Sequence, residues 1–172
     1  MICPDCNKKM KKVKGNYKYK ESGLDNIMLK NIPMYACSCN NKFPIIPNVS
    51  HLHDLISENI IKKSWRLTGK EARFLRKEMG VNATSFAKFL NVSKVTISRW
   101  ENESKPISVI SDKLIRSIFI LKKEAIEDRL LSDFLKCIES VSQEKQKRLP
   151  MISIPAKSII NYKGFGSSLA AA

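Results

Sequence analysis

The spacing of apolar residues changes near residue 50 and predicts a β-rich first part followed by a helical second part. Up to residue 47 the apolar side chains are spread over short segments, as in a small β-hairpin or meander. From residue 51 they recur at three- and four-residue steps, as on one face of a helix. These positions are Tyr17, Tyr19, Leu24, Ile27, Leu29, Ile32 and Tyr35 in the first part, then Leu52, Leu55, Ile56 and Ile60. The chain is therefore expected to be mainly α with a small β domain at its N-terminus.

Prolines and changes of periodicity divide the chain into parts. Pro44 and Pro47 interrupt regular structure and end the first domain. The expected parts are the N-terminal domain 1–47, a linker with a connector helix 48–66, a bundle of short helices 67–118, a helical extension 119–165, and a disordered tail or cloning remnant 166–172. Within the extension, the β-branched segment 151–160 is expected to be a strand or an ordered arm.

Capping signals predict three successive short helices in the bundle. Thr68 is an expected N-cap, and Glu71 three residues later completes a capping box. Gly80 ends this helix. The next helix is expected to start near Asn82–Thr84, and Ser93 caps the one after it.

The amphipathic stretch after residue 112 has two interpretations. It either packs back on the helical bundle or forms the interface of a homodimer, and the dimer is favoured. Cys137, on this stretch, is expected to be a buried small apolar residue and not a redox switch.

Residues 84–102 have the pattern of a helix-turn-helix. Ala87 supplies the small residue that a close helix crossing needs, and 90–92 supplies the short turn. Ile97 is expected to face the core while the start of the second helix stays polar and exposed. An ordinary helical hairpin would share the apolar positions, but it would not require the S-R-W-E-N sequence after the turn.

The geometry of this motif assigns roles to residues, because the second helix places its N-terminal side chains at base edges in the major groove. The expected base readers are Lys94, Val95, Thr96 and Arg99. Arg99 suits a bidentate contact to guanine, with an ion pair to Glu103 as the alternative. Glu101 is expected to orient Arg99 or to cap the loop, and Trp100 to pack in the core. The expected phosphate contacts are Ser85, Lys88, Ser98, Asn102, Ser104 and Lys105.

Four of the five cysteines form two close pairs, C-P-D-C and C-S-C, about thirty residues apart. Two short loops that each deliver two thiolates suit a structural zinc ion, here held by Cys3, Cys6, Cys37 and Cys39. The second pair has only Ser38 between its cysteines, so His51 or His53 is an alternative fourth ligand. Disulfides are disfavoured because no export signal is present.

The net charge of +15 favours a polyanionic partner, and it is concentrated in two places. Residues 62–105 hold eleven Lys and Arg against four Asp and Glu, while residues 1–47 hold nine Lys against three acids. No apolar run approaches the ~20 residues of a membrane span. A cytoplasmic protein that binds double-stranded DNA, with no membrane partner, is expected.

Residues 67–80 and 85–102 resemble the Xre/Cro-type helix-turn-helix family. With the two cysteine pairs, residues 1–118 are similar to the MqsA (YgiT-type) antitoxins, which join a zinc-binding domain to an Xre-type domain. This resemblance implies a dimeric repressor that binds an inverted-repeat operator, regulates its own toxin-antitoxin operon, and has a cognate toxin as a further partner. The C-x-C pair and the extra C-terminal residues depart from the family pattern.

Two alternatives remain open from the sequence. One is a stand-alone regulator of a phage or mobile element without a toxin, and the other is a toxin-neutralising protein whose DNA binding is secondary. An enzyme is not expected, because four cysteine ligands leave a metal no open coordination position and no acid–base or nucleophilic constellation is present.

Overall fold

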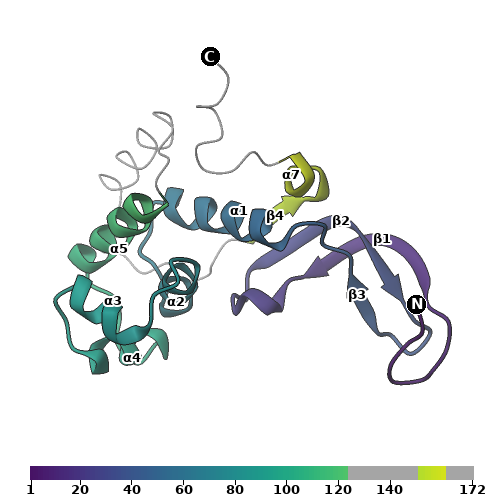
Figure 1. The fold of residues 1–172 in the computed structure, drawn as a ribbon, viewed down its shortest axis with the longest axis horizontal. Coiled ribbons are helices and arrows are strands. Elements are labelled where there is room, and N and C mark those ends of the chain that lie inside the picture. The colour runs from purple at the N-terminus through teal and green to yellow at the C-terminus, as the bar shows by residue number, and fades with distance from the viewer. Residues whose placement is uncertain (124–150, 162–172) are drawn as a thin grey trace, which may run out of the picture.

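A computed structural model describes residues 1–123 and 151–161 as an elongated arrangement of one sheet and a set of helices (Figure 1). Residues 124–150, which include Cys137 and much of the predicted extension, and 162–172 lie outside the described residues. The elements in chain order are β1 (Lys11–Lys18), the short 3-10 helix η1 (Lys20–Ser22), β2 (Ile27–Ala36), β3 (Lys42–Pro44), α1 (Val49–Lys62), α2 (Gly69–Glu78), α3 (Ala83–Phe89), α4 (Lys94–Glu101), α5 (Val109–Lys122), β4 (Ile152–Pro155) and α7 (Ala156–Asn161).

The N-terminal part is a twisted antiparallel hairpin with additions along one edge. β1 pairs antiparallel with β2, and β3 pairs with the end of β2, so the predicted meander is confirmed. The alternation of buried residues on β2 changes phase between Leu29 and Ile32. The chain absorbs this extra residue at Asn31, which has φ 55°, opposite an irregularity between Gly15 and Tyr17 on β1. Both halves of β2 therefore turn their apolar side chains to one core.

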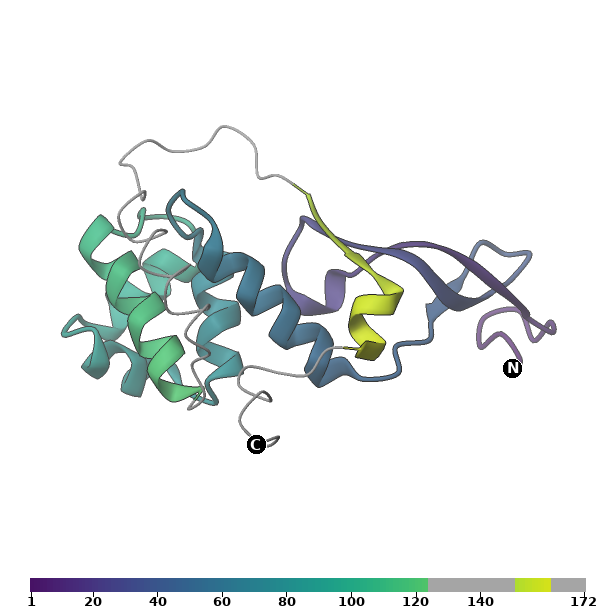
Figure 2. The ribbon, with the colours of Figure 1, turned by 90° about the horizontal axis from the view of Figure 1, so that it is seen from above.

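Helix α1 is the structural centre of the molecule and more than a connector. Its N-cap Asn48 accepts a hydrogen bond from the backbone N–H of His51, so the helix begins at Val49. Leu52, Ile56 and Ile60 are fully buried. Figures 1 and 2 show α1 running between the sheet at one end and the helices α2–α5 at the other.

The segment after residue 150 returns to the N-terminal sheet. β4 pairs in parallel with the start of β2, from Ile27↔Ile152 to Lys30↔Pro155, and α7 then packs near α1 (Figure 2). Of the segment 151–160, expected to be a strand or an ordered arm, only Ile152–Pro155 is a strand, and the helix α7 (Ala156–Asn161) begins directly after it. The physical reason for the strand is its composition: β-branched side chains favour an extended backbone and Pro155 lacks an N–H group. The side chains of Ile154 and Ile159 are buried.

The helical part is a small bundle built as the capping signals predict. Thr68 and Glu71 form a capping box, Gly80 has φ 66°, and Asn82 and Ser93 cap α3 and α4. A fourth helix, α5, follows Pro106 and is capped by Ser108. Among the described residues, no helix is both long and apolar enough to cross a bilayer.

Candidate nucleic-acid interface and metal centre

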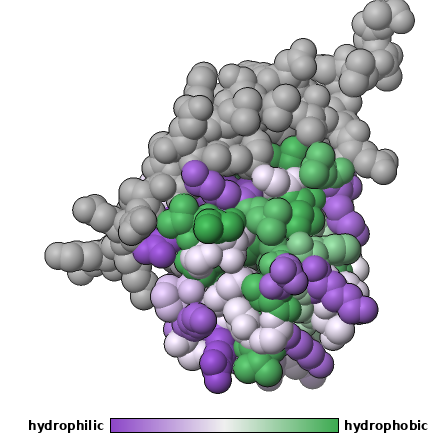
Figure 3. All heavy atoms as spheres, turned by 90° about the vertical axis from the view of Figure 1, so that its left-hand side faces the viewer, coloured by the Kyte–Doolittle hydropathy of each residue, from purple (hydrophilic) through white to green (hydrophobic). Residues whose placement is uncertain are grey.

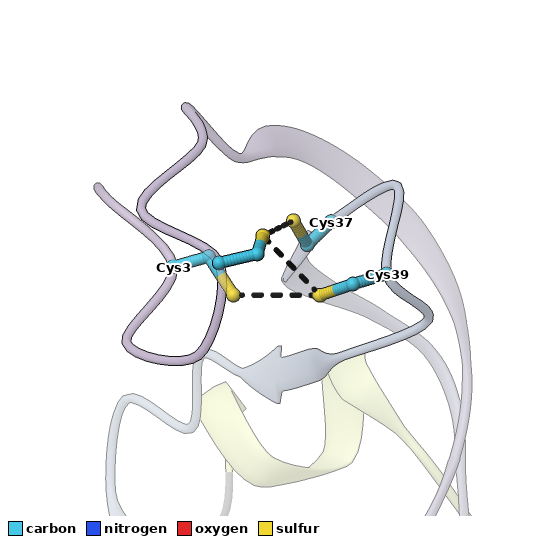
Figure 4. A group of neighbouring side chains, drawn as sticks. Cys3, Cys37 and Cys39 are labelled. Atoms are coloured by element: carbon cyan, nitrogen blue, oxygen red, sulfur yellow. Dashed lines mark hydrogen bonds between the residues drawn. The ribbon is translucent and has the colours of Figure 1, made fainter.

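Two tight loops bring the four N-terminal cysteines together at the far end of the sheet (Figure 4). In the first loop, the backbone N–H of Asn7 donates to the carbonyl of Cys3, and Asn7 adopts φ 55°. In the second, the N–H of Cys37 donates to the carbonyl of Asn41, and Asn40 adopts φ 70°. Asparagine tolerates this left-handed conformation better than most residues, so each loop can turn back within a few positions.

The sulfur positions fit a tetrahedral metal ion. The four Sγ atoms all lie within 4.8 Å of one another. Cys6 Sγ lies 3.3 Å from Cys37 Sγ and 3.5 Å from Cys39 Sγ, and Cys3 Sγ lies 3.5 Å from Cys39 Sγ. A tetrahedral zinc with Zn–S bonds of about 2.3 Å would separate its sulfurs by roughly 3.8 Å. These distances exceed a disulfide bond, and the four thiols are free.

Hydrogen bonds within the group lower the pKa of the Cys3 and Cys37 thiols and raise the pKa of the Cys6 and Cys39 thiols. Burial raises the pKa of the Cys3 thiol, but backbone hydrogen bonds at Asp5 and Cys6 and the side-chain amide of Asn41 outweigh that effect and lower the pKa to about 6. Four sulfur ligands complete a tetrahedral shell and leave no position for a substrate or an attacking water. The arrangement can therefore stabilise structure, and it is unsuited to catalysis by a metal.

Neither histidine takes the place of a cysteine in this group. His53 lies on α1, where its Nδ1 is 2.8 Å from the Glu78 carboxylate and its Nε2 is 2.9 Å from the Tyr19 hydroxyl. The carboxylate accepts from Nδ1–H, and in the neutral ring Nε2 then accepts from the Tyr19 hydroxyl. His51 lies in the first turn of the same helix. Both thiols of the C-x-C pair therefore belong to the four-cysteine group, and His53 instead links the sheet to α2.

The helix-turn-helix predicted for 84–102 is present as α3 and α4. The small residue Ala87 is only 4% exposed, and its carbonyl accepts from the N–H of Val92. Asn91 makes the turn with φ 50°. At the start of α4, Ser93 Oγ accepts from the backbone N–H of Thr96. This short turn fixes the angle between the helices.

Helix α4 has one buried face and one exposed face. Ile97 and Trp100 are 1% and 4% exposed and pack in the core, as predicted. Lys94, Val95 and Arg99 face solvent. Thr96 is half-buried, and its hydroxyl is 2.9 Å from Ser93 Oγ.

The candidate phosphate contacts lie on α3, on α4 and in the loop that follows it. Lys88, Ser98, Asn102, Ser104 and Lys105 are exposed, and Ser85 is half-buried at the start of α3. The Ser104 hydroxyl donates to the carbonyl of Arg99, which folds this loop back against α4. The structure thus brings Ser98, Asn102 and Ser104 to the end of α4.

Glu101 does not orient Arg99, which was the first of the two roles expected for it. Its carboxylate binds Arg76 on α2 in a two-pronged ion pair, with Nε–Oε1 at 2.6 Å and Nη2–Oε2 at 3.0 Å. Arg73 Nε lies 3.7 Å from the same carboxylate. Arg99 is exposed, and in the described part of the chain it forms no ion pair with Glu103 or any other acid. Its guanidinium is therefore open to a ligand.

A buried cation that the sequence did not single out holds α5 in place. Arg116 is completely buried, with Nε 2.6 Å from Asp112 and Nη atoms donating to the carbonyls of Ile61, Lys63 and Trp65. Asp112 also accepts from the N–H of Leu67. The i,i+4 spacing of Asp112 and Arg116 predicts their pairing, but the three carbonyls come from the last turn of α1 and the loop after it, more than fifty residues away.

Comparison with known protein families matches residues 73–111 to the helix-turn-helix family. The match covers α2 from Arg73, the two helices of the motif, and the start of α5. No curated protein and no solved structure matches the chain. The segment is an Xre-type helix-turn-helix domain, which indicates a DNA-binding regulator, a class whose members are typically not enzymes.

Proposed function

From the Xre-type helix-turn-helix domain at residues 73–111, we propose that the chain is a sequence-specific repressor that binds double-stranded DNA through α4. The observation that carries this proposal is the division of α4 into a buried face with Ile97 and Trp100 and an exposed face with Lys94, Val95 and Arg99. Arg99 is exposed and forms no ion pair with another described residue, so it can reach guanine O6 and N7 in the major groove. Ser85, Lys88, Ser98, Asn102, Ser104 and Lys105 then fix the register on the phosphates.

The repressor acts as a homodimer on an inverted-repeat operator. Apolar side chains are exposed on α5 at positions that share one face of the helix: Ile110 is 80% exposed, Leu114 38% and Leu121 71%. Figure 3 looks at this end of the molecule and shows apolar side chains gathered there. A soluble monomer rarely leaves a continuous apolar stripe in water, so a second copy is its expected cover.

The four cysteines hold one structural zinc ion. The sheet up to residue 47 is small, and a domain of that size is usually stabilised by a metal or a disulfide. A protein partner can bind the exposed side of this zinc domain. The combination of a zinc domain with an Xre-type domain supports an antitoxin-type autoregulator. The cognate toxin would be encoded beside it, in the same operon.

Selection of bound duplexes from a random pool tests the DNA-binding proposal. Full-length protein loaded with zinc should enrich an inverted repeat, and the same sequence should occur upstream of its own gene. A variant in which Lys94, Val95 and Arg99 are alanine should enrich nothing. Enrichment of the same sequence by that variant would show that α4 does not read the bases.

For the antitoxin role, expression of the neighbouring small reading frame should stop growth, and co-expression of this chain should restore it.

A further inference from the structure

The lysines of the zinc domain form a second charged surface, far from α4. All nine lysines of residues 1–47 are exposed. Four of them make up the basic finger, defined as Lys11, Lys12 and Lys14 on β1 with Lys42 on β3. We propose that the basic finger binds the phosphate backbone of duplex DNA beside the site that α4 reads. This inference rests on the proposed function.

The three acids of this domain have partners outside the finger, and none of them forms an ion pair with a finger lysine. Residues 1–47 contain three acids. Asp5 accepts from the side-chain amide of Asn41 at 2.5 Å, and Glu21 accepts from the hydroxyl of Tyr17 at 2.6 Å. Asp25 is paired with Lys70 of α2. Among the described residues, none of the finger lysines forms an ion pair, and their charge is available to an external anion.

The sheet presents these lysines in several directions. β1 is at the edge of the sheet, and its residues 11–14 are all exposed. In the register, Lys11 and Lys42 flank Ala36 on one face, while Lys12 lies opposite Tyr35 and projects to the other face. A projection with cations on both faces and along its edge can approach a phosphate backbone closely. Lysine binds phosphates as a point charge without sequence preference, as a contact outside the operator requires.

Contacts with α2 keep the finger at a fixed place relative to α4. Lys70 pairs with Asp25 at the base of the sheet. His53 bridges Tyr19 of the sheet and Glu78 of α2, and its ring packs edge-on against Phe74. Figure 1 shows α4 and the sheet at opposite ends of the long axis, both on the same side of α1. A duplex held by α4 that extends along this side of the molecule would bring its phosphate backbone to the finger.

The test compares two triple variants of the zinc-loaded, full-length protein. K11Q/K12Q/K14Q removes three charges from the finger. The matched control K30Q/K113Q/K157Q removes three lysines outside the finger, on β2, α5 and α7. Affinity is measured against salt concentration for the selected operator, for a random duplex, and for a single-stranded RNA competitor. The operator is prepared with flanks of two lengths, and zinc content and thermal midpoint are checked for each protein.

For the finger variant, the slope of log K against log salt concentration should be shallower than the wild-type slope by about 2–3, because each phosphate contact contributes about 0.9 to the slope. Its preference for operator over random duplex should stay within about twofold, and it should lose the gain in affinity that wild type shows on long flanks. The control should keep the wild-type slope. Equal slopes for the two variants would overturn the inference while leaving the proposed function intact.

Two further results separate the remaining possibilities. A wild-type protein that prefers no DNA sequence would overturn the proposed function, yet the random-duplex slopes would still decide whether the finger contacts DNA. If the finger variant instead loses affinity mainly for single-stranded RNA, duplex DNA is the wrong partner. Tyr35 and Phe43 lie beside Lys12 in the register and could stack unpaired bases in that case.

Discussion

The carbonyl oxygen of Trp100, at the end of α4, occupies the place where a side chain on Gly69 would begin. A Cβ built on Gly69 would lie 1.8 Å from that oxygen and 2.8 Å from the carbonyl carbon. Gly69 is the first residue of α2, directly after the N-cap Thr68. The start of α2 and the end of the helix that carries the candidate base readers are therefore in direct backbone contact, and only glycine permits it.

Gly69→Ala should destabilise the helix-turn-helix domain, because a backbone atom cannot move aside as a flexible side chain can. The expected loss is about 1–3 kcal/mol in the free energy of unfolding, as for other overpacked sites. Urea denaturation followed by circular dichroism measures it. Gly15→Ala is the control, since its Cβ would meet only the Met34 side chain, at 3.5 Å. Equal midpoints for the two variants would contradict the close contact.

Asp112→Ala should be more costly, because it leaves the Arg116 guanidinium buried without its counter-charge. Breaking a buried pair by removing one partner typically costs about 3–5 kcal/mol. Glu58→Ala removes a half-exposed i,i+4 pair with Lys62 on α1 and should cost about 0.5 kcal/mol or less. The double variant D112A/R116M should recover part of the loss. A single variant as stable as Glu58→Ala would show that Arg116 does not depend on this carboxylate.

Arg99→Ala should remove discrimination between operator and random duplex by about 1–3 kcal/mol, the contribution of one bidentate base contact. Fluorescence anisotropy with both duplexes at one salt concentration measures the ratio of affinities. Lys113→Ala on α5 controls for the loss of one positive charge. Specific binding that survives intact would assign the reading of bases to residues other than Arg99.

Lys88→Ala should weaken binding to operator and random duplex alike, because a phosphate contact carries no sequence information. The salt slope should become shallower by about 0.9, the value for one released counterion. The affinity ratio between the two duplexes should stay constant across the titration. An unchanged slope would remove Lys88 from the phosphate contacts.

Metal analysis of freshly purified, reduced protein should give about one zinc per chain. A chelator or Cys37→Ser should unfold the sheet, because metal binding supplies folding free energy to a small domain. Acid should have the same effect: protons compete with the metal for the thiolates, so zinc affinity falls as the pH falls. Ser38→Ala, between two ligands, is the control that should keep the metal. Protein that is folded but free of metal would refute the zinc site.

The sequence predicted local structure well wherever a few neighbouring residues decide it. The capping box at Thr68, the left-handed residue at Gly80 and the cap at Ser93 depend on atoms within one turn of helix, so composition and spacing were enough. The burial of Ile97 and Trp100 followed from helical periodicity. The four cysteines were recognisable because each pair forms its own short loop.

Contacts between distant segments were decided only by the tertiary structure. Glu101 was expected to act near Arg99, but the packing of α2 against α4 brings Arg76 to it from 25 residues away. β4 completes an edge of β2 through pairing over more than a hundred residues. The side chains of a short sequence motif determine which backbone conformations that motif favours. Which charge meets which carbonyl depends on how the helices and the sheet pack, and that arrangement is set by the whole buried core.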